Sequence, residues 1–258
     1  MRSIDEVHRV LALIERGLND CEVFRETGIP RGTVRDWRQG KTPRRGPLGA
    51  RIAPEASCDR CGHPRHDFAA MPQLDYAYLL GLYLGDGTIS RARRGVFKLR
   101  VILDAKYPAI IDECQAAMAA VCPRSKVNRV ARIGCIEVYS YSKMFPCLFP
   151  QHGPGMKHKR SIWLASWQET IASAAPGRLL RGLIHSDGCR VTNRVRANGK
   201  EYQYPRYFFC NHSADIRGIF CRYCELLEIE WRPDGWRNIS IARRESVALL
   251  DRFVGPKR

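Results

Sequence analysis

The sequence lacks a long uncharged run of apolar residues, and its acidic residues are few beside its basic ones. The first absence excludes a membrane-spanning helix of about 20 apolar residues. The second absence, 26 acidic residues against 43 Lys and Arg, gives a formal net charge of +17. This charge favours a polyanionic partner, nucleic acid above all, although a GC-rich genome would also raise the Arg content.

We expect no secretion signal in MRSIDEVHRVLALIERGLND, because acidic residues are interleaved with its apolar ones. We therefore expect a cytoplasmic protein of bacterial type, associated with the nucleoid when bound to DNA, and no membrane partner. The 11 cysteines are odd in number within a large chain, which argues against a disulfide framework. Most are expected to be reduced and buried. Cys221 and Cys224 lie in IRGIFCRYCELLEI, where helical packing accounts for them better than a metal.

The first 45 residues have the pattern of a small all-α helix-turn-helix domain. Apolar residues recur at helical spacing from Ile4 to about Asn19, and a second short helix spans Glu22 to Thr27. Gly28 is expected to make the turn, and Pro30 to open a third helix that runs through Trp37.

The third helix has the division of faces that a helix lying in a DNA major groove requires. Ile29, Val34 and Trp37 are expected to pack inward. The outward residues, which we expect to contact DNA, are Arg31, Thr33, Arg35 and Arg38. A small helical bundle with a basic, solvated face remains the alternative.

Residues 46–70 are predicted to form a basic linker, because the stretch GKTPRRGPLGARIAPEAS is rich in Pro, Gly and Arg and has no periodicity. The PRRG run suits a DNA-contacting arm, and a solubilising charge run explains it equally well. The linker ends in CDRCGHPRH, where Cys58, Cys61, His63 and His66 offer ligands for Zn²⁺. Zinc sites usually draw their second ligand pair from another element, so a reduced, metal-free loop is the competing interpretation.

The remainder contains one clear internal repeat: YLLGLYLGDG ends at Gly87 and RLLRGLIHSDG ends at Gly188. Each copy is an apolar helix that ends in Asp-Gly. The first has Gly81 and Gly85 four residues apart, and the second has Gly182 and Ser186. Small residues at this spacing let two helix backbones approach closely, so we expect the two helices to pack together. Gly87 and Gly188 are expected to end them in the left-handed conformation.

This packing would bring Asp86 and Asp187 together at two neighbouring helix C-termini. Carboxylates there face the negative end of each helix dipole and repel one another, so the arrangement calls for a cation. Oxygen ligands suit Mg²⁺, which can activate water for attack on a phosphodiester. The alternative is that each Asp-Gly is only a turn, which is harder to maintain for two copies in the same register.

At these residues the chain resembles the LAGLIDADG homing endonucleases, in the single-chain form with two motifs. The resemblance covers about residues 71–258. It implies two pseudo-symmetric αββαββα half-domains, 71–172 and 173–258, whose antiparallel sheets form a saddle on double-stranded DNA. It further implies a monomer with internal pseudo-two-fold symmetry, in which the motif acids bind Mg²⁺ and both DNA strands are cut.

Strand patterns fit this plan. In VFKLRVIL, Phe97, Leu99 and Val101 are expected to face the core, with Lys98 and Arg100 on the DNA side. Further DNA contacts are expected from Lys157 and Lys159 in GPGMKHKRSI, and from Arg206 in YPRYFFCN.

By resemblance, a lysine near the end of the second strand assists at the scissile phosphate, and Lys106 in LDAKYPAII matches that place. Its ordinary interpretation is an exposed cation at a helix start. The corresponding stretch of the second half, CNHSAD, has no lysine.

Two functions follow from these patterns. The first is a sequence-specific, Mg²⁺-dependent double-strand DNA endonuclease, favoured because Asp86 and Asp187 are both present. The second is a transcription regulator that binds DNA on the same scaffold without cutting it, favoured by the N-terminal helix-turn-helix.

Overall fold

The computed structural model describes residues 4–40, 58–62, 66–197, 199–255 and 257. The chain divides into two compact units, Met1–Cys58 and Asp59–Arg258. The division falls inside the turn that joins Cys58 to Cys61, and Asp59, Arg60 and Cys61 of this turn belong to the larger unit. No helix in the described part is long and apolar enough to cross a membrane.

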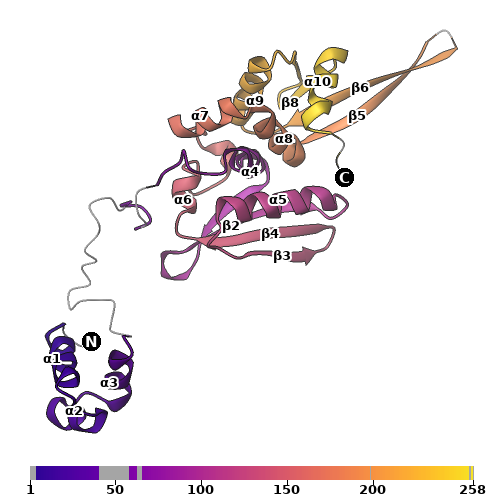
Figure 1. Cartoon of the computed structure of the whole chain (residues 1–258). Helices are drawn as coiled ribbons and strands as arrows, with labels where there is room; N and C mark the ends of the chain where they lie inside the picture. The colour runs from indigo at the N-terminus through magenta and orange to yellow at the C-terminus, as the bar shows by residue number, and fades with distance from the viewer. Residues whose placement is uncertain (1–3, 41–57, 63–65, 198, 256, 258) are drawn as a thin grey trace. The chain divides into compact units, whose positions relative to one another are not determined.

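The smaller unit is a three-helix domain made of α1 (Ile4–Glu15), α2 (Asp20–Thr27) and α3 (Arg31–Arg38) (Figure 1). Its helix α1 ends earlier than the sequence predicts. Gly17 takes a left-handed conformation with φ 90°, and Asn19 caps α2 by accepting bonds from the backbone of Cys21 and Glu22. The predicted turn at Gly28 is confirmed, because this residue also has a left-handed backbone.

The predicted inward face of α3 is confirmed. Val34 and Trp37 are buried, as is Ile29 just before the helix, and all three join a separate small core with α1 and α2. Pro30 is the N-cap of α3 and not its first residue, a shift of one position.

The larger unit repeats one order of elements. The first half contains α4 (Gln73–Gly85), β1 (Gly87–Arg91), β2 (Phe97–Asp104), α5 (Pro108–Val121), β3 (Val127–Arg132), β4 (Cys135–Ser142) and α6 (Phe145–Leu148). The second contains α8 (Pro176–Asp187), β5 (Gly188–Ala197), β6 (Lys200–Cys210), α9 (Ala214–Leu226), β7 (Arg232–Asp234), β8 (Asn238–Ile241) and α10 (Arg244–Phe253). Between them lie the short η2 (Lys157–Lys159) and α7 (Ser166–Ala174); η1 (Arg93–Gly95) joins β1 to β2.

Both sheets are antiparallel and have four strands, in the orders β1-β2-β4-β3 and β5-β6-β8-β7. Each is therefore two hairpins joined through their second strands. The predicted α/β class with two αββαββα halves is confirmed by this topology. Helix α5 covers the first sheet, and α9 and α10 lie against the second, as Figure 1 shows.

The alternation predicted for β2 is confirmed for Leu99 and Val101, which are fully buried, while Phe97 packs at the edge of the core. Helices α4 and α8 pack against each other between the two sheets. A single core of buried side chains runs through both halves. The two halves therefore form one structural body.

The contact between α4 and α8 depends on glycine. A Cβ atom at Gly81 would lie 2.5 Å from the carbonyl oxygen of Leu179, and one at Gly182 would lie 2.2 Å from that of Tyr78. Both distances are far below van der Waals contact with backbone that cannot rotate away. The predicted close approach of the two motif helices is confirmed.

The reason expected for the final glycines is wrong. Neither Gly87 nor Gly188 has a positive φ, and Gly188 is extended with φ −109°. A Cβ at Gly87 would instead lie 2.4 Å from Cα of Tyr83, and one at Gly188 would lie 2.8 Å from Cα of Ile184. Glycine is required at both positions because the backbone folds tightly back along the last turn of the helix that it leaves.

Candidate active site and nucleic-acid interface

The structure brings the two motif acids together. Asp86 is the C-cap of α4 and Asp187 is the last residue of α8. The junction is tight, because a Cβ on Gly85 would lie 2.9 Å from Oδ2 of Asp187 and 2.2 Å from Oγ of Ser186. The small residues that let α4 and α8 meet therefore also place the carboxylate of Asp187 against the backbone at the C-terminus of α4.

The surroundings oppose ionisation of both acids. Burial raises the pKa of Asp86 to about 6, and repulsion from Asp187 adds to this shift. Burial also raises the pKa of Asp187, although its Oδ2 accepts a hydrogen bond of 2.6 Å from Nδ2 of Asn211, which lowers it. Asn211, from the CNHSAD stretch that has no lysine, therefore holds one acid of the pair.

A lysine closes the C-terminus of α4. Nζ of Lys157 donates to the carbonyl oxygens of Tyr83 at 2.5 Å, Leu84 at 2.9 Å and Gly85 at 2.6 Å. These are acceptors that a helix end leaves without intrahelical partners, and they carry the negative end of its dipole. Burial lowers the pKa of Lys157 to about 8 even though Asp187 and Asp86 attract its ammonium group.

This geometry corrects the expectation that Lys157 contacts DNA from the surface, because its ammonium group turns inward to α4. Sequence reasoning placed it in a basic loop and had no signal for the inward turn. A second lysine, Lys257, also interacts with both carboxylates, and burial lowers its pKa. Two ammonium groups therefore attract the two carboxylates.

Lys106 lies in the turn after β2, where the sequence places it, and forms an exposed ion pair of 2.6 Å with Asp104. The charged groups that shift the pKa of Asp86 are Asp187, Lys157 and Lys257. Lys106 is not among them. Its catalytic role stays a prediction.

The raised pKa of Asp86 has a consequence for stability. In the unfolded chain this acid titrates near 3.9, so the native protein loses stability as pH rises from about 4 to about 6, by up to about 3 kcal/mol. Asp86→Asn removes the loss. In metal-free buffer at about pH 7.5 the variant is expected to exceed the wild type by about 1–3 kcal/mol in urea unfolding, and by almost nothing at about pH 4. If the variant and the wild type had the same free energy of unfolding at both pH values, ionisation of Asp86 would not destabilise the native protein.

The outer faces of the two sheets carry cations at matching places. Lys98 pairs across the sheet with Ser90, the third residue after Gly87, and Arg206 pairs with Val191, the third residue after Gly188. The ammonium group of Lys98 forms an ion pair of 2.5 Å with Glu137 and lies 4.1 Å from the centre of the Tyr139 ring. Part of its charge is therefore offset within the sheet.

Two arginines on these faces hold a polar atom for which the structure gives no partner. Nε of Arg100 and Nε of Arg206 are both buried and make no hydrogen bond within the described residues. A guanidinium group that has given up part of its hydration is suited to a phosphate or a guanine edge.

Hairpin β5–β6 extends well past the rest of its sheet. Its strands pair from Gly188↔Phe209 to Ala197↔Lys200, whereas β6 pairs with β8 only from Tyr207 to Cys210 (Figure 1). The extension bears exposed apolar and aromatic residues beside its cations: Val195, Tyr202, Tyr204, Arg194 and Arg196. Asn198, which follows β5, lies outside the described residues.

In the smaller unit, the four residues expected to contact DNA differ in their exposure and in their hydrogen bonds. Arg31 and Arg35 are exposed and Thr33 is half-buried. The guanidinium group of Arg38 is tied to its own domain, with Nε 3.0 Å from Oδ1 of Asp20 and NH2 donating to the carbonyl oxygen of Leu18 at 2.7 Å. Arg38 therefore fastens α3 to the start of α2. Lys159, in η2 of the larger unit, is exposed.

Three of the four predicted zinc ligands come together with a residue that the sequence did not suggest. One ligand atom each from Cys58, Cys61, His66 and Cys147 lies within 4.8 Å of all the others. His63 lies outside the described residues. Cys147 is on α6, far along the chain, and only the fold brings it to the turn. Cys221 and Cys224 are buried in α9, as predicted from helical packing.

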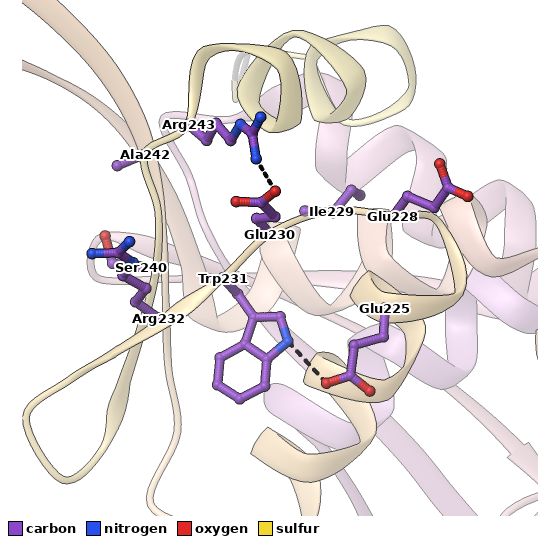
Figure 2. Close-up of a pocket in the computed structure, with 9 residues that line it drawn as sticks. All are labelled: Glu225, Glu228, Ile229, Glu230, Trp231, Arg232, Ser240, Ala242 and Arg243. Carbon is purple, nitrogen blue, oxygen red and sulfur yellow. Dashed lines mark hydrogen bonds and ion pairs between the residues drawn. The ribbon is translucent and has the colours of Figure 1, made fainter.

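A pocket of about 960 Å³ lies elsewhere, between α9, β7 and the start of α10. Figure 2 shows two interactions among its polar groups: Glu230 pairs with Arg243, and Nε1 of Trp231 donates to Glu225. With Glu228 it holds three acids, which suits neither DNA nor the chemistry of the carboxylate pair.

No protein-family model and no curated protein matches the chain. Solved structures do. Variants of the homing endonuclease I-DmoI are 15% identical over 70% of this chain and 96% of theirs, with a TM-score of 0.49. The N-terminal LAGLIDADG domain of DUF199/WhiA is 13% identical over 74% and 89%, with a TM-score of 0.45. The meganuclease I-AabMI, bound to uncleaved DNA, is 10% identical over 69% and 82%, with a TM-score of 0.44. The structural neighbours are thus of the family that the Asp-Gly motifs resemble.

Proposed function

We propose that the chain binds double-stranded DNA sequence-specifically and hydrolyses phosphodiester bonds at Asp86 and Asp187 with Mg²⁺. The observation that carries the proposal is the meeting of two half-buried carboxylates at adjacent helix ends, in an arrangement that raises the pKa of both. Placing two carboxylates together in a half-buried site opposes folding. Such a pair therefore favours a functional role, in which a cation is bound. Asp86 directly precedes β1 and Asp187 directly precedes β5, so each acid lies where the chain enters one of the two sheets.

The residues present fit Mg²⁺. The donors at the site are oxygens, which is the preference of this cation. Ionised carboxylates supply the negative charge, and at pH 7 a pKa of about 6 leaves Asp86 mostly ionised. When bound, the cation would stabilise charge on the phosphoryl group and lower the pKa of a water molecule.

The chain's own residues have distinct roles in this proposal. Asp86 and Asp187 hold the cation, and Asn211 orients Asp187 through its 2.6 Å hydrogen bond. Lys157 neutralises the end of α4 from the side of the carbonyl groups, which leaves the carboxylate oxygens of Asp86 available. Lys106, exposed after β2, is the expected contact to the scissile phosphate.

DNA binding is supported by the outer faces of the two sheets. Lys98 and Arg206 occupy equivalent positions, as a pseudo-two-fold axis that relates the two halves of a DNA site requires. The β5–β6 ribbon, with its exposed tyrosines and arginines, has the form of a two-stranded element that enters a major groove. Arg31 and Arg35 on α3 add a second DNA-binding element, and the formal charge of +17 fits both.

A non-cleaving DNA-binding regulator is the second candidate, and one observation favours it. Lys157 and Lys257 together supply two positive charges next to two carboxylates, so the pair is compensated without a metal. In that case the carboxylate–lysine cluster is a structural element between the halves, and the DNA-binding surfaces remain.

A single assay separates the two candidates. The purified full chain is incubated with a library of randomised duplex DNA, once with Ca²⁺ to select bound sequences and once with Mg²⁺ to select cut ends. The proposal expects both pools to be enriched in one shared sequence, with cut ends appearing only in Mg²⁺. Enrichment by binding with intact DNA in Mg²⁺ identifies the regulator. No enrichment in either pool contradicts both candidates.

A further inference from the structure

A cluster of thiol and imidazole ligands lies outside the carboxylate site. It contains Sγ of Cys58, Cys61 and Cys147 and a ring nitrogen of His66, all mutually within 4.8 Å. Around a tetrahedral Zn²⁺ with bonds of about 2.0–2.3 Å, ligand atoms are separated by roughly 3.3–3.8 Å. A contraction of about an ångström at most is therefore enough to close this cluster on a metal.

The ligands are held in place before any metal is considered. Cys61 and Cys147 are buried, at 7% and 8% exposure. Cys147 is on α6, whose other residues, Phe145, Pro146 and Leu148, are all buried. An arginine fixes the turn to this helix, because NH1 of Arg60 donates to the carbonyl oxygen of Pro146 at 2.9 Å.

The imidazole is oriented by stacking. The ring of His66 lies 5.3 Å from that of Phe68, which stacks at 3.8 Å on Trp167 of α7. Its Nε2 then faces the thiols, 3.3 Å from Sγ of Cys61. Gly62, directly after the Cys-x-x-Cys turn, has a left-handed backbone with φ 68°. A rigid ring nitrogen and three sulfur atoms converge on one point.

We infer that Cys58, Cys61, His66 and Cys147 bind one structural Zn²⁺, with Cys147 as the ligand that the local sequence does not supply. Three sulfurs and one imidazole are a set that closed zinc sites use, and magnesium and calcium avoid it. The site is independent of the proposed nuclease centre, whose donors are oxygens. Its effect is to fasten the segment before α4 to α6, so that the chain enters α4 from a fixed point.

The test measures zinc in the full chain, purified with a reductant and without a chelator, by mass spectrometry of the metal. We expect about one zinc per chain in the wild type and a loss of at least about fivefold in Cys147→Ser, because a structural site rarely survives the loss of a ligand. Two controls accompany it. Cys122→Ser removes a similarly buried cysteine outside the cluster and is expected to retain zinc. His63→Ala removes the competing local ligand and is also expected to retain it.

A second measurement does not depend on whether the variants fold. After exchange of zinc for Co²⁺ in the wild-type chain, the intensity of the thiolate-to-cobalt charge-transfer band reports the number of sulfur ligands, and we expect three. Two sulfurs, loss of zinc in His63→Ala, full zinc in Cys147→Ser, or a wild-type chain without zinc would each overturn the inference. A disulfide among Cys58, Cys61 and Cys147 in the purified protein would do the same.

Discussion

Asp86→Asn and Asp187→Asn are each expected to lower Mg²⁺-dependent cleavage of the selected DNA sequence by about a thousandfold or more, since each removes charge needed at the transition state. Binding in Ca²⁺ is expected to change by less than about threefold, because neither acid lies on the outer face of a sheet that we assign to DNA. Asn preserves the shape of both side chains, and its amide oxygen at position 187 still accepts the hydrogen bond from Asn211.

The measurement is single-turnover cleavage at saturating protein, beside a binding titration on the same duplex. Asp112→Asn serves as the matched control, because this carboxylate is exposed on α5 and pairs with the surface residue Arg129. It should cut as the wild type does. Cleavage that persists in both motif variants would place the chemistry elsewhere, and loss of binding in both would mean that the acids support the DNA-binding fold.

Gly182→Ala is expected to destabilise the larger unit by about 2 kcal/mol or more, despite the gain of about 1 kcal/mol in helix propensity. The new methyl group would lie 2.2 Å from the carbonyl oxygen of Tyr78 and 3.0 Å from Cα of Gly81. These are backbone atoms in the facing helix, so α4 and α8 must separate. The same separation moves Asp86 from Asp187, so cleavage should fall even where the variant is fully folded.

Gly218→Ala is the matched control for this effect. Gly218 is also within a helix, α9, but it is exposed and a Cβ there has nothing within 4 Å. It should stabilise the protein by about 0.5–1 kcal/mol. Urea unfolding of both variants measures the difference. If Gly182→Ala were as stable as Gly218→Ala, the helix contact would have to be looser than the structure describes.

Much of the fold could be predicted because its signals are local. The spacing of Gly81 and Gly85, with Gly182 and Ser186 in the second copy, indicated two helices in close contact, and the acid after each followed from the same register. Alternation in β2 indicated which face Leu99 and Val101 take. Such patterns depend on the period of a single element.

The remainder depends on contacts between distant segments. Lys157 is in a loop with three neighbouring cations or imidazoles, and nothing local distinguishes the one that turns inward to the end of α4. Cys147 gives no signal, since one cysteine among apolar residues looks like ordinary core. The left-handed conformation expected at Gly87 was wrong for a related reason: the glycine is needed by the path of the following strand against Tyr83, not by the helix end itself.

The first hairpins of the two sheets differ in length: β5–β6 forms a long arm and β1–β2 a short arm. Strands β5 and β6 pair over ten residues and β1 and β2 over five, so one arm exceeds the other by five residue pairs. At about 3.4 Å per residue, the excess is roughly 17 Å, which is the rise of about five base pairs of duplex DNA. On the proposed function, the recognised sequence is lopsided: it extends further from the centre on the side of β5–β6, and a perfect palindrome is not its natural target.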